Sequence, residues 1–303
     1  MYAKYVTNAT TVQSQAISDL ALLLTGSPVS ALSSSCNKTL SMITPGAPAP
    51  GWTLVDSAAP QSGQVISAPD ADGLTTKYVR LHVYSAVQFS LTGSESWDAT
   101  AHTGLNPTTA GSTSTALLVT DAPGMYHLFV TPRSFYICKV GNSPANAVGV
   151  GAFEFTREAE HLKGTTYPCF VIANGTVLSG IYNTFDLPRT KDVALTSGDT
   201  NSFAQLQRGT MGIRFGTTAS GNVPKPPAGP SRAVNDVPYY EFRPVFLIKS
   251  LGSYSHTALV YGRLYDVVDT TPGIGNLLDT FPSGSVRYSL VAADANSTVL
   301  IRN

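Results

Sequence analysis

The feature that most constrains this chain is a strict alternation of apolar and polar side chains over Tyr78–Tyr84. Val79, Leu81 and Val83 point to one side of an extended strand, and the residues between them point to the other. Such alternation is typical of an antiparallel sheet with one buried face. Further runs rich in β-branched and aromatic residues lie at Met125–Val130, Ser134–Val140, Val148–Thr156, Tyr239–Lys249, Thr257–Val268 and Ser285–Ile301.

We therefore predict a mainly β fold, with antiparallel β-sandwich or barrel-like domains, one short N-terminal helix and proline-rich arms. Thr131-Pro132-Arg133 is short enough to join two of the strands as a hairpin. The Ser-, Thr- and Gly-rich segment Thr92–Thr115 separates strands, and its middle, Trp97–Pro107, is predicted to be a long exposed loop. No repeat of roughly 20 to 50 residues is visible, which disfavours a propeller or a solenoid.

The one helix is predicted near the start of the chain. Thr10 and Gln13 have the spacing of a capping box, and Gly26 followed by Pro28 ends the segment. Such an amphipathic helix packs on its own sheet or docks on a partner, and we favour the first. Its apolar residues recur at helical spacing and are Val12, Ala16, Ile17, Leu20, Leu23 and Leu24.

Proline-rich segments divide the rest of the chain. Residues 44–51 and 222–230 read as stiff, extended arms, and the second contains Pro226 and Pro227. A boundary is predicted in the loop that begins near Asp186. The predicted domains are residues 1–185, with the helix and a set of strands, and residues 186–303, with more strands and the second arm.

The low charge content narrows the possible partners. Only 13% of the residues are charged, and 19 acidic residues balance 19 basic ones. DNA affinity depends on clustered Lys and Arg, and no basic run occurs, so no nucleic-acid partner is predicted. No apolar run is long enough for a membrane span, and the N-terminus does not read as a secretory signal. A net charge of zero favours association, which suggests a protein that works in an assembly.

The three cysteines are too few for a disulfide framework, and no C-x-x-C pair suggests zinc. We interpret Cys36, Cys138 and Cys169 as thiols, the last two as small buried apolar side chains. A bridge between Cys138 and Cys169 stays open as an alternative, because their segments could be neighbouring strands.

No motif in the sequence predicts catalysis, a cofactor or a metal. Glu158 and His161 have the i, i+3 spacing of some di-iron ligands, but no helical bundle supplies the other carboxylates, so the cluster Glu154–His161 is interpreted as a solvated turn that ends a strand. G-x-S-x-G is absent, and the pairs Gly149/Gly151 and Gly273/Gly275 complete no phosphate-binding motif. We predict that the chain is not an enzyme.

Carboxylate pairs near aromatic residues keep a glycan-active alternative open. Glu95 and Asp98 flank Trp97, and Asp266 and Asp269 lie near Tyr265. Glycan binding needs only exposed rings, and Trp52 and Trp97 are the candidates for it.

After the capped helix, the chain contains a series of characteristic segments: Pro45-Gly46, Gly51–Asp56, Thr76–Leu81, Gly93–Asp98, Gly151–Arg157 and Tyr167–Val171. With this layout, the first 180 or so residues resemble virion proteins of tailed bacteriophages, in particular tail and baseplate components. The resemblance implies a non-enzymatic structural protein of the tail, baseplate or fibre-attachment region, which assembles with copies of itself and with other virion proteins and needs no cofactor. A capsid decoration or head protein, or a glycan-binding or glycan-cleaving surface protein, is the alternative. The candidate partner or glycan contacts are Trp52, Trp97, Pro226 and Pro227.

Overall fold

The structure is a computed structural model, and antiparallel strands dominate the residues that it describes. The only α-helix among these residues is α1 (Gln13–Leu24), and η1 (Val29–Ala31) is a short 3-10 helix. The predicted mainly β class is therefore confirmed. The described residues are 1–44, 50–85, 88–105, 107–109, 117–118, 124–140, 147–157, 168–175, 185–186, 204–208, 242–250, 258–270, 278–283, 286–294 and 297–302.

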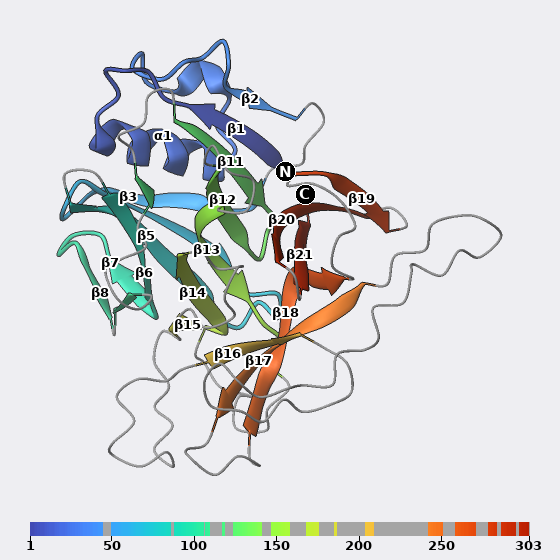
Figure 1. The fold of residues 1–303 in the computed structure, drawn as a ribbon. Coiled ribbons are helices and arrows are strands. Elements are labelled where there is room, and N and C mark those ends of the chain that lie inside the picture. Colours follow the sequence, from blue (N-terminus) through green and yellow to red (C-terminus); the bar gives the residue numbers. More distant parts are fainter. Residues whose placement is uncertain are drawn as a thin grey trace.

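Most of the described strands form one long sheet and one smaller sheet, both antiparallel, and two further strands form a separate small hairpin (Figure 1). The long sheet has thirteen strands, in the order β19 (Thr280–Ser283), β20 (Val286–Asp294), β21 (Ser297–Arg302), β18 (Ala258–Thr270), β17 (Arg243–Ser250), β16 (Ala204–Arg208), β15 (Phe185–Asp186), β14 (Phe170–Gly175), β13 (Ala147–Glu154), β12 (Phe135–Val140), β11 (Met125–Val130), β1 (Tyr2–Val6) and β2 (Met42–Ile43). The smaller sheet has six, in the order β10 (Leu117–Leu118), β6 (Gln88–Ser94), β5 (Thr76–Ser85), β4 (Gly63–Pro69) and β3 (Thr53–Ala59), with β9 (Thr108–Thr109) also on β6.

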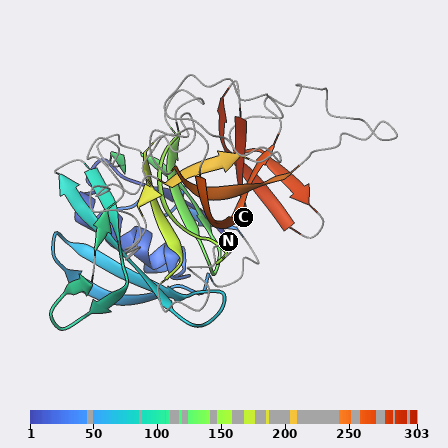
Figure 2. The same cartoon turned by 90° about the horizontal axis from the view of Figure 1, so that it is seen from below.

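The main core lies between the smaller sheet and the N-terminal part of the long sheet. α1 packs against β3, β4, β5 and β6 of the smaller sheet (Figure 2), and its Asp19 accepts a hydrogen bond from Tyr5 OH of β1 in the long sheet. Alternate residues of the facing strands point inward, which gives the sandwich its apolar filling. The inward residues include Ile17, Leu20 and Leu24 of the helix, Ile66, Val79 and Leu81 of the smaller sheet, and Leu128, Val150 and Ile172 of the long sheet.

The long sheet also bends back on itself. Phe155, just after β13, forms a bridge with Leu264 of β18, and Thr156 N donates to the Arg263 carbonyl at 2.8 Å. Gly262 lies so close to the Thr156 carbonyl that a side chain would clash there. The strands β13 to β18 therefore form a barrel-like ring, which β13 shares with the sandwich.

The helix begins later than the sequence indicates. The predicted capping box of Thr10 and Gln13 is wrong, because Val12 is the N-cap and Gln13 is already helical. Val12 has no side-chain acceptor, and its own N–H donates to Gln15 Oε1 at 3.4 Å. Thr11 instead joins the preceding turn, where its Oγ1 accepts from Asn8 N at 2.8 Å.

The predicted end of the helix is confirmed. Gly26 has a φ of +85°, a left-handed conformation that favours glycine. Its N–H donates to the Leu23 carbonyl at 3.0 Å and Ser27 N donates to the Leu22 carbonyl at 2.9 Å, which is the Schellman pattern. The helix packs on the chain's own sheets, the outcome favoured from the sequence.

Most predicted strands are present, with two revisions. The hairpin of β11 and β12 around residues 131–134 is confirmed, and the run Ser285–Ile301 contains the two strands β20 and β21. The predicted loop Trp97–Pro107 is largely wrong, since β7 (Ser96–Asp98) and β8 (Thr103–Leu105) form a small hairpin there. The three cysteines are buried and none forms a disulfide, so the Cys138–Cys169 bridge is absent.

The arm prolines at 45–49 and 222–230 lie outside the described residues. The division at residue 185 stays a prediction, and it falls within β15, which pairs with β14 and β16. In the described part of the chain, no helix has the length and apolar character needed to span a membrane.

Two buried histidines make the stability of this fold depend on pH. His82 and His127 are each 4% exposed; His82 Nε2 lies 2.9 Å from Thr92 Oγ1, and His127 Nδ1 lies 2.6 Å from Tyr2 OH. Burial lowers the pKa of each imidazole to about 4, from 6.5. Between these values the unfolded chain binds more protons than the folded one, so stability falls as the pH drops through this window.

We expect each histidine to account for a loss of roughly 1–3 kcal/mol between about pH 6.5 and pH 4. Denaturant unfolding across this range measures the effect. The pH dependence should flatten in a His82→Gln, His127→Gln double variant. Each single variant, His82→Gln or His127→Gln, should flatten only part of the dependence, and a double variant that keeps the full slope would contradict the role of these two histidines.

Candidate functional site

The strongest cluster of polar groups with access to solvent lies where the β7–β8 hairpin meets the edge strand β3. Asp56 of β3 has a side chain only 3% exposed, and its Oδ2 accepts hydrogen bonds from Trp97 Nε1 at 2.9 Å and His102 Nδ1 at 2.8 Å. Its Oδ1 accepts from Ala58 N at 2.8 Å. Asp56, Trp97 and His102 form what we call the hairpin cluster.

Local backbone geometry brings these three residues together. The register between β3 and β4 shifts on both sides of Asp56, so an irregular edge strand turns its carboxylate toward the hairpin. In the hairpin, Asp98 Oδ1 accepts from Thr100 N at 2.8 Å and Ala101 N at 2.9 Å, which closes the turn. His102 follows with a φ of +55° and points back at Asp56.

The electrostatics of the hairpin cluster favour the ionised carboxylate. Burial alone would raise the pKa of Asp56, but hydrogen bonds from His102, Ala58 and Trp97 outweigh it and hold that pKa below its ordinary value. Chemically, the cluster offers a partly exposed indole and a partly exposed imidazole, both held in place by the buried Asp56 carboxylate. These residue types also occur in carbohydrate sites.

The carboxylate pairs considered for glycan cleavage are not brought together as pairs. Glu95 lies at the bend between β6 and β7, and the Asp98 carboxylate is used to close the turn of the hairpin. Asp266 Oδ2 accepts from Thr131 Oγ1 at 2.7 Å and its Oδ1 lies 3.4 Å from Arg302 Nη1, which ties β18 to the β11–β12 turn and to β21. Asp269 lies further along β18, opposite Arg243 and Val299.

The remaining candidate contacts have different outcomes. Trp52 is 3% exposed, packs edge-on against Phe135 at 5.2 Å and donates from Nε1 to the Thr131 carbonyl at 2.9 Å. A ring in this position belongs to the core and offers a glycan no stacking face. Trp97 is partly exposed and belongs to the hairpin cluster. Pro226, Pro227, Glu158 and His161 lie outside the described residues.

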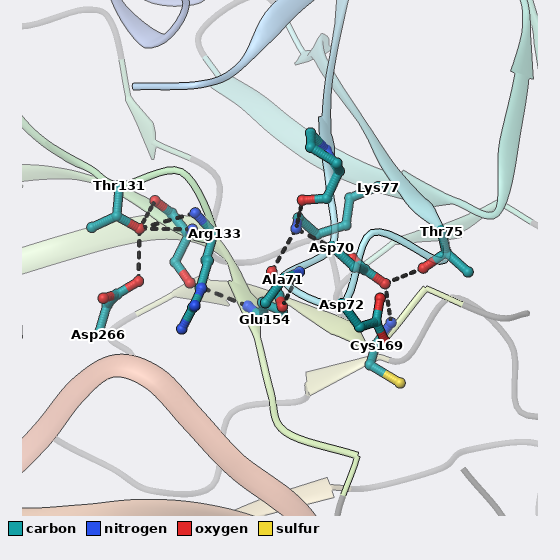
Figure 3. A network of polar contacts seen from close by, with 12 residues as sticks. Asp70, Ala71, Asp72, Thr75, Lys77, Thr131, Arg133, Glu154, Cys169 and Asp266 are labelled. Atoms are coloured by element: carbon teal, nitrogen blue, oxygen red, sulfur yellow. Dashed lines mark hydrogen bonds and ion pairs between the residues drawn. The ribbon is translucent and has the colours of Figure 1, made fainter. Parts of the chain in front are cut away.

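Sequence reasoning missed a buried ionic network between the two sheets (Figure 3). Lys77 of β5 is fully buried, and its Nζ lies 2.6 Å from Glu154 Oε2 and 3.2 Å from Asp70 Oδ1. Arg157 continues the network with contacts of 3.1 Å to Asp70 and 2.6 Å to Asp72. We call Asp70, Asp72, Lys77, Glu154 and Arg157 the Lys77 network.

The network corrects one interpretation of the sequence. Glu154 and Arg157 were assigned to a solvated turn, yet Glu154 is 3% exposed and the side chain of Arg157 is 12% exposed. Burial raises the pKa of Glu154, although the charge and hydrogen bond of Lys77 and the amide of Ala71 pull it down. The signal that could have revealed it is strand parity, because Glu154 follows Val150 and Ala152 on the inward face of β13.

No protein-family model matches the sequence, and no curated protein matches it either. Among the described residues, no group of three or more His, Cys, Asp or Glu side chains is placed to hold a metal ion.

Removal of the Asp56 carboxylate should release the hairpin. We expect Asp56→Ala to leave Trp97 Nε1 and His102 without their acceptor, to lower stability by about 1–3 kcal/mol and to speed amide exchange at Glu95, whose N–H donates to the Leu105 carbonyl. Hydrogen exchange followed by mass spectrometry measures this. Ser96→Ala, on the exposed side of the same hairpin, should change little, and equal exchange in both variants would contradict the role of Asp56.

Loss of the Lys77 ammonium should lower the free energy of unfolding by more than loss of the Asp56 carboxylate does. Lys77→Met leaves two buried carboxylates without their cation, and we expect a loss of about 3–5 kcal/mol in the free energy of unfolding. The matched control is Lys38→Met, because Lys38 donates to the Ser30 carbonyl at an exposed site and should contribute below about 1 kcal/mol. Similar unfolding midpoints for the two variants would contradict a structural role for the network.

Proposed function

We propose that this protein is a non-enzymatic structural component of a tailed phage virion, in the tail, baseplate or fibre-attachment region, and that it acts by protein–protein assembly. The phage part of the proposal is supported by the sequence resemblance in residues 1–180. The assembly part is supported by the architecture, the edge strands and the charge balance.

The observation that carries the assembly part is the edge strand β3. It is seven residues long, it ends the smaller sheet, and its only partner strand in the described structure is β4. An edge of this kind accepts a strand from another chain through main-chain hydrogen bonds. Thr53, Leu54, Ser57 and Ala58 are exposed on it, and Leu54 is 40% exposed.

The edge also has features that restrict pairing to a matched partner. Its register with β4 is irregular on both sides of Asp56, and Asp56 turns a charge inward. Both features limit indiscriminate sheet extension. A specific partner strand is therefore favoured over open-ended aggregation.

The charge balance is compatible with a protein that functions within an assembly. With 19 acidic and 19 basic residues the net charge is zero, so copies of the chain do not repel one another strongly. Several of the described charges are used inside the fold, in the Lys77 network, at Asp56 and at Asp266.

Glycan binding is a second candidate, favoured by the hairpin cluster. Trp97 presents a partly exposed ring beside Asp56 and His102. This arrangement suits the stacking of a sugar ring better than it suits the addition of a β-strand. A receptor-binding part of the same region would combine both functions.

The first experiment is native mass measurement of the purified chain together with negative-stain imaging, with and without a lysate of the presumed phage. We expect discrete oligomers and antibody label on the distal tail. Label on the head would favour the capsid alternative. A stable monomer that is absent from virions would contradict the proposal, and binding of that monomer to host glycans would favour the glycan-active alternative.

A variant pair tests the edge itself. Leu54→Lys with Ala58→Lys places two charges on β3, and we expect self-association or partner binding to weaken by about tenfold or more. Leu74→Lys is the control, because Leu74 is 63% exposed on the turn between β4 and β5 and away from the edge. Equal oligomer populations in both variants would exclude β3 as the interface.

A further inference from the structure

The surroundings of Lys77 are those of a reactive amine as well as of an ion pair. Its Nζ lies 2.6 Å from Glu154 Oε2, 2.8 Å from the Pro69 carbonyl and 3.2 Å from Asp70 Oδ1. The side chains of Lys77, Asp70 and Glu154 are 0%, 2% and 3% exposed, and the Trp52 ring centroid lies 5.8 Å from Nζ. A primary amine is thus held between two carboxyl groups where water is excluded.

We propose that Lys77 and Asp70 condense in the folded protein to form an intramolecular isopeptide bond, with Glu154 as the proton carrier. The inference goes beyond the proposed function and does not depend on it. It assigns a self-modification site to the hairpin of β4 and β5.

The hydrogen bonds of Asp70 make it the acyl donor. Its Oδ2 accepts from Arg157 Nη2 at 3.1 Å, from Cys169 N at 3.3 Å and from Thr75 Oγ1, while its Oδ1 faces the amine. Three donors on one oxygen stabilise the negative charge that develops there when a nucleophile adds to the carboxyl carbon. Oδ1 is therefore the oxygen that leaves as water.

The position of Glu154 suits proton transfer. Its Oε1 accepts from Ala71 N at 2.8 Å, which fixes the carboxyl group, and its Oε2 points at Nζ. Burial raises its pKa, so the protonated form is more accessible than for an ordinary glutamate.

The step balances without any co-reactant. The Lys77 ammonium gives a proton to Asp70 through Glu154, which leaves a neutral amine and a carboxylic acid. The Nζ lone pair then forms a C–N bond with Cγ of Asp70, and the charge develops on Oδ2. Oδ1 takes a second proton from nitrogen through Glu154, the C–Oδ1 bond breaks, and one water leaves. The amide keeps one N–H, which the Pro69 carbonyl or Glu154 accepts.

The bond would cross-link the two strands at the end of their hairpin. Asp70 follows β4 directly, and Lys77 pairs with Ala68 within the β4–β5 ladder. A covalent ring at this place restricts the unfolded chain and locks the turn that docks on β13.

The test is the intact mass of the folded, purified chain after denaturation. We expect a mass lower than the sequence mass by one water, and a tryptic peptide that spans residues 39–80, uncleaved after Lys77, with fragment ions that join Asp70 to Lys77. An unmodified mass, or ready cleavage after Lys77, would overturn the proposal.

A succinimide at Asp72-Gly73 also loses one water, so hydroxylamine treatment is included. Hydroxylamine opens a succinimide and leaves an amide intact. Loss of the mass deficit after this treatment would overturn the proposal.

Variants distinguish the roles of Lys77 and Glu154 in the condensation. Lys77→Arg keeps the charge and should restore the full mass, while Glu154→Gln should lower the cross-linked fraction at least about tenfold. Lys38→Arg is the matched control and should keep the cross-link. A cross-link that persists in Lys77→Arg would overturn the assignment, and the wild-type mass decides the case if a variant does not fold.

Discussion

As the chain folds, before any cross-link can form, the buried ammonium of Lys77 has to be matched by negative charge, and the fold depends on this requirement. An ammonium removed from water is strongly destabilising unless carboxylates and hydrogen-bond acceptors replace the solvent. Asp70 comes from the turn after β4 and Glu154 from the end of β13, so the smaller sheet must dock on the long sheet in one register for the charges to meet. Arg157 and Cys169 N then complete the set of hydrogen-bond donors to Asp70 and fix the positions of the segments that contain them.

The same principle recurs at other junctions of this charge-poor chain. Asp56 holds the β7–β8 hairpin, Asp266 joins β18 to the turn at Thr131, and Asp19 of α1 accepts from Tyr5 OH at 3.0 Å and from Ser33 N at 2.7 Å. Each tie joins segments that are distant in sequence and depends on a carboxylate whose orientation is fixed by two or more donors. Charged groups used in this way connect the elements of the described interior.

The strands could be predicted because apolar and polar residues alternate along them. The Lys77 network could not, because Lys and Glu are residue types that normally lie on the solvent-facing side of a strand. The alternation over Tyr78–Tyr84 follows from one buried face, and the hairpin at residues 131–134 from the shortness of its turn. Lys77 continues the inward stripe of Val79 and Leu81, and Glu154 continues that of Val150 and Ala152, but a charge at such a position normally marks the solvent side. Only the oppositely charged residue on the facing sheet reveals that such a side chain points inward. Trp52 failed as a surface candidate for the converse reason, since an aromatic residue after a proline-rich segment reads as exposed until Phe135 and the Thr131 carbonyl are seen around it.

β13 connects the two β structures, and this explains the position of the ionic network. Its middle residues fill the sandwich, while Phe155 and Thr156, directly after it, close the barrel-like ring against β18. Glu154 lies between the residues that fill the sandwich and those that close the ring, and Arg157 follows the latter directly. A sheet can be extended at an edge such as β3 without disturbing this junction, because the edge and β13 are on different sheets. The architecture therefore separates a fixed interior, held by buried charges, from an edge available for another chain, and that separation is what a subunit of a larger particle needs.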